Sequence, residues 1–179
     1  EIRICNAGVQ YLDMVAYVMK RLGVTWQVEG DDLLISSNQE LKIISDYGDA
    51  IPEIKTNVWP AFPTDLISIV ITIATQAEGT IMFHDWMYNG RMYFTDKLVS
   101  MGAKIILCDP YRCIVEGPAK LYGAKVDSPD IRAGMALLLA GLAAEGKSTI
   151  RHISQIDRGY SNVEDKLRAL GAKIKRIKE

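Results

Sequence analysis

An internal repeat is the feature of this 179-residue sequence that most restricts its fold. The triplet Asp-Lys-Leu at residues 96–98 precedes Met-Gly-Ala-Lys-Ile at 101–105, and the same triplet at 165–167 precedes Leu-Gly-Ala-Lys-Ile at 170–174. Upstream of each copy, an apolar stretch ends in Ala-Glu-Gly, and a weaker copy lies at residues 19–24. The two clear copies lie 69 residues apart. Repetition at a fixed offset indicates one supersecondary unit that is used several times.

We therefore predict one domain made of three related units, at about residues 1–50, 51–118 and 119–179. In the third unit, Asp130 is a candidate N-cap for an apolar helix over 131–144, and Gly146 is placed to end that helix in a left-handed cap. The other elements expected there are a strand at 148–153, a helix at 161–170 opened by a capping box at Ser161–Glu164 and closed by Gly171, and a final strand at 172–177.

The second unit carries the same signals. Its expected elements are a helix at 66–77 opened by Thr64 and Asp65, a strand at 80–84, a helix at 95–101 capped by Thr95, and strands at 104–107 and 112–116 joined by a turn at 109–111. The helices at 66–77 and 131–144 are apolar on nearly every face, so each must be surrounded by protein, whereas the amphipathic helices at 10–22, 95–101 and 161–170 belong nearer the surface. The sequence predicts an α/β fold whose repeated helices are buried against sheets.

Composition excludes several classes of function. With 24% charged residues and a net charge of -1, the chain has no general electrostatic attraction for nucleic acid or for an acidic membrane. Its three cysteines, Cys5, Cys108 and Cys113, lack the number and spacing of a disulfide framework or a zinc site, which favours reduced thiols in a cytoplasm. The longest apolar windows, 66–74 and 135–144, are too short to cross a bilayer. The first residues resemble the middle of a strand rather than a signal peptide, so we expect a piece of a longer protein.

Four polar sites stand at the ends of the expected elements. They are residues 62–65, Arg91, residues 130–132 and residues 157–160. A helix N-terminus offers unpaired N–H groups and partial positive charge, and an arginine beside it can bind phosphate or carboxylate through two hydrogen bonds. Three such arginines, Arg91, Arg132 and Arg158, could hold one small polyanion.

Each of these residues also has a purely structural interpretation. Asp65 and Asp130 suit the first turn of a helix through capping and dipole alone. The arginines could be surface residues paired with local acids, and residues 157–160 could be a simple turn. His84 and His152 lack a Ser or Cys partner at motif spacing, and neither a metal site nor a glycine-rich phosphate loop is indicated.

Taken together, the sites resemble the C-terminal part of enolpyruvyl transferases of the UDP-N-acetylglucosamine 1-carboxyvinyltransferase type. The most specific stretches are residues 60–65, 130–133, 156–160 and 164–172. The resemblance implies an inside-out domain of three α/β units that closes against a similar second domain missing from this chain. It also implies the first committed step of peptidoglycan synthesis, in which the enolpyruvyl group of phosphoenolpyruvate moves to the 3-hydroxyl of UDP-N-acetylglucosamine without metal or organic cofactor.

The resemblance also implies roles for particular residues. Asp65 would be the general base near the acceptor hydroxyl, and the backbone of Met87 would contact the nucleotide sugar. Arg91, Arg132 and Arg158 would face phosphoenolpyruvate, with Asp130 beside them and with Arg158 counted among the catalytic residues.

Two departures from the family pattern limit these expectations. Residues 88–91 read Tyr-Asn-Gly-Arg where the family usually has Phe-Glu-Asn-Arg, and no cysteine here matches the family's reactive cysteine loop. The fragment alone is therefore expected to be inactive, with its proton donor elsewhere. Two alternatives remain open, an enolpyruvyl transferase for another acceptor such as shikimate 3-phosphate and a non-catalytic version that binds a nucleotide sugar or a regulatory partner.

Overall fold

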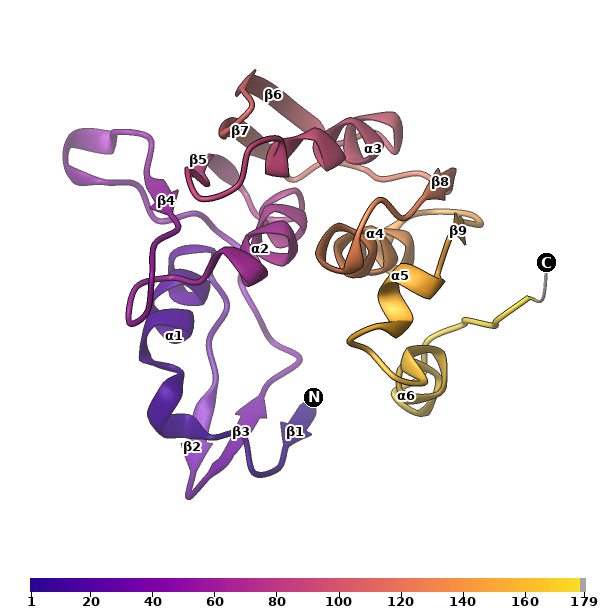
Figure 1. Cartoon of the computed structure of the whole chain (residues 1–179). Helices are drawn as coiled ribbons and strands as arrows, with labels where there is room; N and C mark the ends of the chain where they lie inside the picture. The colour runs from indigo at the N-terminus through magenta and orange to yellow at the C-terminus, as the bar shows by residue number, and fades with distance from the viewer. Residues whose placement is uncertain (178–179) are drawn as a thin grey trace.

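Two central helices are surrounded by three β-sheets in this protein, whose computed structural model describes residues 1–177 (Figure 1). The helices are α2 (Ile67–Ala74) and α4 (Ile131–Ala143), and they pack directly against each other. Six of the eight residues of α2 are buried, and the other two, Ile69 and Ile73, are partly buried, so no residue of this helix is fully exposed to solvent. The predicted α/β class is confirmed, while the division into three units at the stated boundaries stays a prediction.

The first sheet contains three antiparallel strands in the spatial order β1-β3-β2. Its elements are β1 (Ile2–Ile4), helix α1 (Asp13–Arg21), β2 (Gln27–Glu29) and β3 (Asp32–Ile35). The helix buries Val18, and Leu22 directly after it is fully buried in the common core.

The second sheet contains four strands in the order β4-β5-β7-β6, and only the β4–β5 pair is parallel. Its strands and the helix that follows β5 are β4 (Glu53–Lys55), β5 (Gly79–His84), α3 (Thr95–Ser100), β6 (Lys104–Asp109) and β7 (Arg112–Gly117). Ile81, Phe83, Cys113 and Val115 alternate onto the face toward α2 and are fully buried. The helix and strands predicted here lie where expected, to within a few residues at each end.

The third sheet is a single parallel pair in the described part of the chain. Its elements are β8 (Lys125–Asp127), β9 (Thr149–Arg151) and the helices α5 (Ser154–Asp157) and α6 (Val163–Ala169). Unlike α2, helix α4 is not covered on every side, because Leu142 is 40% exposed. The prediction that both apolar helices are fully surrounded is therefore wrong for α4.

Several predicted element ends are also wrong. Residues 172–177 form no strand, because a strand requires a hydrogen-bonded neighbour and none of the described residues provides one. Helix α6 begins after Asn162, whose side chain makes no capping bond, and the Glu164 carboxylate expected in a capping box binds Arg176 instead. The Thr95 hydroxyl donates to the Met92 carbonyl rather than capping α3.

Two helix ends were predicted from glycine positions, and one of these predictions is correct. Gly171, with φ of 98°, follows α6 as predicted, and the next N–H, of Ala172, donates to the Leu167 carbonyl. Helix α4 instead ends at Ala143, since Ala144 is already extended, and Gly146 with its positive φ lies in the following turn.

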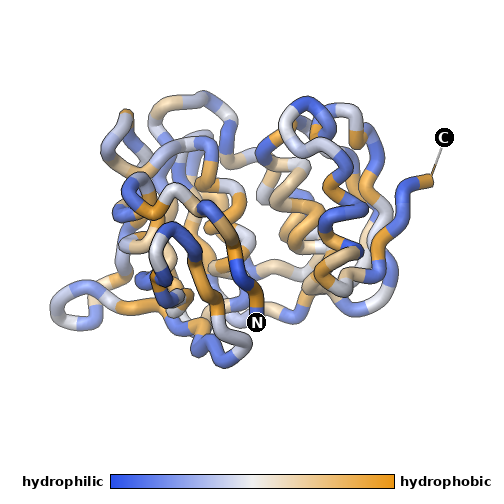
Figure 2. Tube along the Cα trace, turned by 90° about the horizontal axis from the view of Figure 1, so that it is seen from below, coloured by the Kyte–Doolittle hydropathy of each residue, from blue (hydrophilic) through white to orange (hydrophobic). Residues whose placement is uncertain are grey.

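Along the whole chain, hydrophobic and hydrophilic residues alternate in short runs (Figure 2). Within residues 1–177, no helix has both the length and the apolar character that a membrane crossing needs.

Candidate functional site

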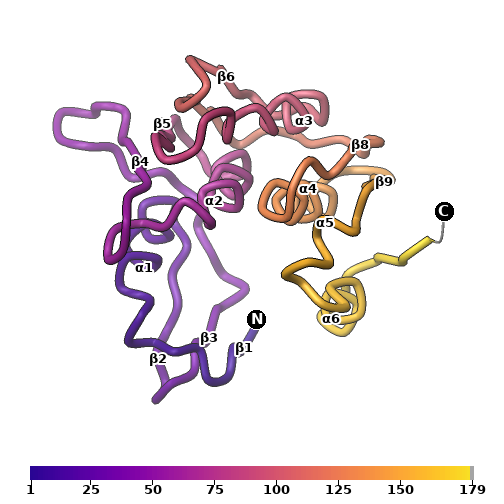
Figure 3. Tube along the Cα trace, in the orientation of Figure 1, coloured from indigo at the N-terminus to yellow at the C-terminus, as the bar shows by residue number. Residues whose placement is uncertain are grey.

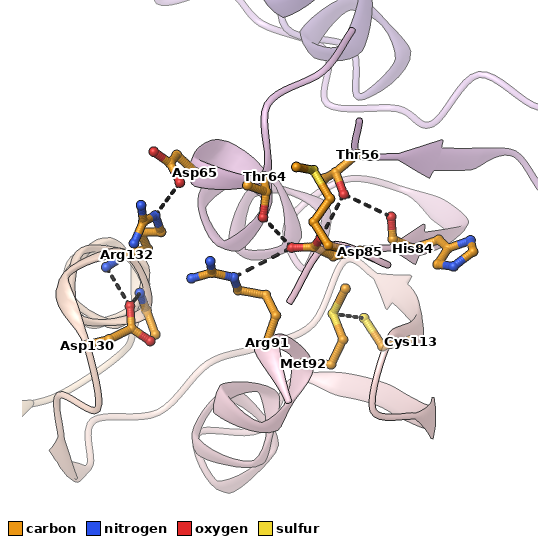
Figure 4. Close-up of polar contacts among 12 residues, drawn as sticks. Thr56, Thr64, Asp65, His84, Asp85, Arg91, Met92, Cys113, Asp130 and Arg132 are labelled. Atoms are coloured by element: carbon orange, nitrogen blue, oxygen red, sulfur yellow. Dashed lines mark hydrogen bonds and ion pairs between the residues drawn. The ribbon is translucent and has the colours of Figure 1, made fainter. Parts of the chain in front are cut away.

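The N-terminal ends of α2 and α4 bring Asp65 and Arg132 together, although 67 residues separate them in the chain (Figure 4). Asp65 lies in the 3-10 turn Thr64–Leu66 that leads into α2, and Arg132 lies in the first turn of α4. The Arg132 Nε donates to the Asp65 carboxylate, and this hydrogen bond raises the pKa of the guanidinium. The packing of α2 against α4 therefore determines the position of this acid–base pair.

Asp130 caps α4. Its carboxylate accepts hydrogen bonds from the backbone N–H groups of Arg132 at 2.7 Å and of Ala133 at 3.0 Å. The sequence prediction of a cap is confirmed, and the capping bonds occupy one of the two carboxylate oxygens. Because Asp130 orders the first turn of α4, it also determines where the backbone of Arg132 lies.

A buried aspartate that the sequence analysis missed lies directly behind this pair. Asp85 follows β5 and is fully buried. It accepts hydrogen bonds from the hydroxyl of Thr56 at 2.8 Å, from the hydroxyl of Thr64 and from the backbone N–H of Met87 at 3.1 Å. The sequence did offer a signal for Asp85, because an acidic residue directly after an apolar strand lies at the strand end, where functional carboxylates are often found.

Arg91 provides the charge that compensates Asp85. Its Nε lies 3.5 Å from the Asp85 carboxylate, its side chain is only 8% exposed, and its guanidinium carbon lies 4.6 Å from the centre of the Tyr88 ring. An ion pair this deeply buried needs both partners, since either charge alone would be left unpaired in a poorly hydrated interior. The cluster of Asp85, Thr56, Thr64 and Arg91 thus links the segment before Asp65 to the loop that follows β5 (Figure 4).

The departure from the family pattern at residues 88–91 fits this loop. Gly90 has φ of 77°, and a Cβ there would approach the Tyr93 ring at 3.1 Å. Glycine adopts this positive φ without strain. The loop holds Arg91 against Asp85 and the Tyr88 ring.

Arg158 lies near the same end of α4 but makes a weaker contact. Gly159 packs so closely on Ile131 that a Cβ at this glycine would lie 2.4 Å from the Ile131 side chain. This approach brings the turn after α5 to the first residue of α4. The exposed Arg158 side chain donates to the side chain of Gln155, at 3.3 Å.

The predicted site residues therefore fall into two connected groups. Asp65, Asp130 and Arg132 are in direct contact at the helix ends, and Arg91 and Met87 are joined to Asp85 behind them. Arg158 precedes Gly159, which packs on Ile131 at the start of α4, and its own side chain donates to Gln155. The observed arrangement places the Arg132 guanidinium and the N-terminus of α4 next to the Asp65 carboxylate, a group that can accept a proton.

The other candidate groups lie apart from these residues. Burial raises the pKa of the Cys113 thiol to about 12, while Cys5 and Cys108 are exposed. His84 pairs with Glu53 at 3.1 Å on the outer side of the second sheet. Among residues 1–177, no three His, Cys, Asp or Glu side chains gather in a way that would hold a metal ion.

Comparison with known proteins identifies the family and the fold. The family model for EPSP synthase (3-phosphoshikimate 1-carboxyvinyltransferase) matches residues 1–167. The fold is that of an enolpyruvyl transferase, since the solved enolpyruvyl transferase NikO from Streptomyces tendae superposes with a TM-score of 0.82 at 25% identity, over 97% of this chain and 39% of that one. An EPSP synthase from Acinetobacter baumannii shares the fold with a TM-score of 0.64 at 16% identity, over 90% of this chain and 36% of that one. The chain belongs to the EPSP synthase family.

Curated relatives within this family are similar along almost the whole chain. The UDP-N-acetylglucosamine 1-carboxyvinyltransferase of Bradyrhizobium diazoefficiens is 54% identical over 99% of this chain, and that of Borreliella burgdorferi is 47% identical over 99%. The resemblance predicted from the motifs is confirmed. The chain spans only 41% and 42% of the length of these two relatives.

Proposed function

We propose that this chain forms one part of an enzyme that transfers the enolpyruvyl group of phosphoenolpyruvate to the 3-hydroxyl of UDP-N-acetylglucosamine and releases phosphate. The observation that carries the proposal is the contact between Asp65 and Arg132 at two adjacent helix N-termini, in a chain that is 54% identical to an enzyme of that name. In this role the protein belongs to peptidoglycan synthesis in the cytoplasm and requires a second domain, which is part of the proposal.

Asp65 is the proposed general base. A sugar hydroxyl is too weak an acid to ionise first, so its proton must pass to a carboxylate while the new C–O bond forms. Asp65 suits this role because its side chain is 58% exposed and so accessible to an acceptor from solvent. The backbone of Met87, positioned by Asp85, is the proposed contact to the nucleotide sugar.

The arginines are the proposed site for phosphoenolpyruvate, with Asp130 beside them. Addition joins the acceptor oxygen to C2 of phosphoenolpyruvate while C3 gains a proton from a donor outside this chain. Elimination then removes a C3 proton and breaks the bond from C2 to the phosphate oxygen. The guanidinium groups of Arg91, Arg132 and Arg158 stabilise the anion through both steps, and domain closure excludes water.

The ion pair suggests how substrate binding activates the base. In the present state the Asp65 carboxylate is bound to Arg132. An anionic group of phosphoenolpyruvate that binds Arg132 competes for this guanidinium and frees the carboxylate to accept the hydroxyl proton. The base therefore becomes available only when the donor substrate is present.

The test is a chimera in which the length that this chain does not span is supplied from the Bradyrhizobium diazoefficiens relative. Phosphate release is measured with phosphoenolpyruvate and UDP-N-acetylglucosamine. Asp65→Asn is expected to lower kcat by at least about 100-fold, the lower range for loss of a general base, with KM changed far less. The exposed Asp96 on α3 gives the matched control, since Asp96→Asn should retain full turnover.

Undiminished turnover by Asp65→Asn would remove the assigned base. The same chimera distinguishes the alternatives prompted by the altered loop at residues 88–91. Faster phosphate release with shikimate 3-phosphate would identify another acceptor. Calorimetric binding of the nucleotide sugar without phosphate release would instead identify a non-catalytic binding protein.

A further inference from the structure

Asp65, the proposed base, extends from a short turn that has no side-chain cap. The turn is Thr64–Leu66, and the residue before it, Pro63, makes no capping bond. The Asp65 side chain is 58% exposed. A carboxylate on such a turn has several conformations available to it, whereas a general base must lie within hydrogen-bond reach of the proton that it removes. The position of the base therefore depends on what else holds this turn.

The residue directly before Asp65 provides such a contact. Thr64 is buried, and its hydroxyl donates a hydrogen bond to the Asp85 carboxylate. Figure 4 shows the two neighbours pointing to different sides of the turn, Thr64 toward Asp85 and Asp65 toward Arg132. The buried hydroxyl thus ties the turn to the end of β5, while the adjacent carboxylate stays accessible.

Asp85 is itself fixed from several directions. One of its carboxylate oxygens accepts hydrogen bonds from the Thr56 hydroxyl and the Met87 N–H. The other accepts the Thr64 hydroxyl and lies 3.5 Å from the Arg91 Nε. Because Asp85 is fully buried, its carboxylate cannot move without leaving polar groups unpaired in a poorly hydrated interior. It is therefore a firm anchor for the turn.

The bond at Thr64 joins two elements that are separate along the chain. Figure 3 follows the chain from β4 through residues 57–63 into α2, and Thr64 lies 21 residues before Asp85. At the opposite end of α2, the fully buried Thr75 also uses its hydroxyl, but it donates at 2.7 Å to the carbonyl of Thr72 in the same helix. Thr75 therefore offers a matched comparison, a buried hydroxyl bond that holds no part of the candidate site.

We propose that Asp85 and Thr64 are positioning residues, and that the buried carboxylate holds the base in place through the Thr64 hydroxyl. This inference rests on the proposed function and assigns to it a hydrogen bond that touches neither substrate. Misplacing a reacting group by about 1 Å can cost about 100-fold in rate, even when the altered residue lies away from the chemistry. Loss of this hydroxyl should therefore appear in kcat, and its effect should pass through Asp65.

The experiment compares two substitutions of Thr64 in the same chimera, with phosphate release as the measurement. Thr64→Val keeps the branched shape and removes the hydroxyl, whereas Thr64→Ser keeps the hydroxyl and removes the methyl group. We expect Thr64→Val to lower kcat by about tenfold, with KM for both substrates changed by less than about threefold. Thr64→Ser should retain at least about half of the parent kcat, because it preserves the bond to Asp85.

Thr64→Ala provides a second comparison, since it differs from Thr64→Ser only by the hydroxyl. Its kcat should fall as far as that of Thr64→Val. Thr75→Val is the matched control, because it also removes a buried hydroxyl donor. It should lower the midpoint of urea unfolding and leave kcat unchanged.

A double variant tests whether the effect passes through the base. In the Asp65→Asn background, Thr64→Val should lower kcat by less than a further factor of about two, because a positioning residue has no effect once the group that it positions is absent. A loss in that background as large as in the parent would overturn the inference. Equal losses of kcat in Thr64→Ser and Thr64→Val, or in Thr75→Val and Thr64→Val, would also overturn it, since the hydroxyl would then only maintain the fold.

The same measurements separate this inference from the proposed function. If Asp65→Asn loses turnover while Thr64→Val and Thr64→Ala keep the parent kcat, the inference is overturned and the proposed function stands. A parent chimera that releases no phosphate would overturn the proposed function, and the inference with it.

Discussion

Two regions of this protein, the one from β4 to β7 and the one from β8 to residue 177, share local hydrogen bonds but differ in their polar interior. In the first the Thr56 N–H donates to the His84 carbonyl at 3.0 Å, and in the second the Ser128 N–H donates to the Arg151 carbonyl at 3.0 Å. In the first region, hydroxyl, amide and guanidinium groups converge on the buried Asp85. In the second, the residue directly after β9 is His152, which corresponds to Asp85 directly after β5. Its side chain is 64% exposed. Local bonds thus follow the repeat, whereas among residues 1–177 the cluster around a buried carboxylate is found in the first of these two regions, beside the candidate site.

The largest expected effect tests whether that cluster stabilises its region. Asp85→Asn keeps the shape of the side chain but leaves the charge of Arg91 buried without a partner, so it should lower the free energy of unfolding by about 3–5 kcal/mol. His152→Asn at the corresponding exposed position should change it by less than about 0.5 kcal/mol. Urea unfolding of both variants measures the difference, and equal losses would show that the two positions are not distinguished by burial.

The next effect compares the two glycines that end α3 and α6. Gly102 and Gly171 both have positive φ, so alanine should cost each about 1–2 kcal/mol in backbone strain. Only at Gly102 does the new Cβ also meet backbone, the Lys120 carbonyl at 2.7 Å, which should add about 1–3 kcal/mol. Thermal unfolding of the two variants provides the comparison. If Gly171→Ala lowers the free energy of unfolding as much as Gly102→Ala does, backbone must already lie against Gly171.

The smallest effect concerns acid stability at the end of the chain. The hydrogen bonds of Arg176 hold the pKa of both the Asp157 and the Glu164 carboxyl groups below their ordinary values. A lowered carboxyl pKa stabilises the fold above the ordinary value near 4, and this contribution is lost as the pH falls through the folded-state pKa. Arg176→Gln should therefore cost under about 1 kcal/mol at pH 7 and nothing at strongly acidic pH, since the pair is largely solvated. Urea unfolding at several pH values measures how the stability lost in Arg176→Gln depends on pH. A stability loss that grows on acidification would contradict the prediction.

The features that could be predicted from sequence are those that depend on neighbouring residues. The Asp130 cap and the turn at Gly171 arise from preferences of a few adjacent positions, and both are observed. A shared site for Asp65 and Arg132 was expected through resemblance to a family, but their direct contact was not predicted, because no local rule joins residues so far apart. Asp85 was missed because its partners come from separate segments that only the folded chain brings together.

The incorrect predictions have a common physical origin. Residues 172–177 have the alternating pattern of a strand, and Ser161 with Glu164 has the pattern of a capping box. Such patterns show which hydrogen bonds a segment could form, but not whether a partner for those bonds lies nearby in the fold. The strand lacks a neighbour among the described residues, and Glu164 has a stronger partner in Arg176. Single-chain patterns therefore fail where the deciding group lies elsewhere in the fold.

The direct packing of α2 on α4 has a consequence for motion. Asp65 and Arg132 extend from the ends of two helices whose sides are locked together, rather than from separate flexible loops. The two groups therefore move as one rigid body whenever the two helices move together, and the distance between the Asp65 and Arg132 backbones is preserved in such a motion.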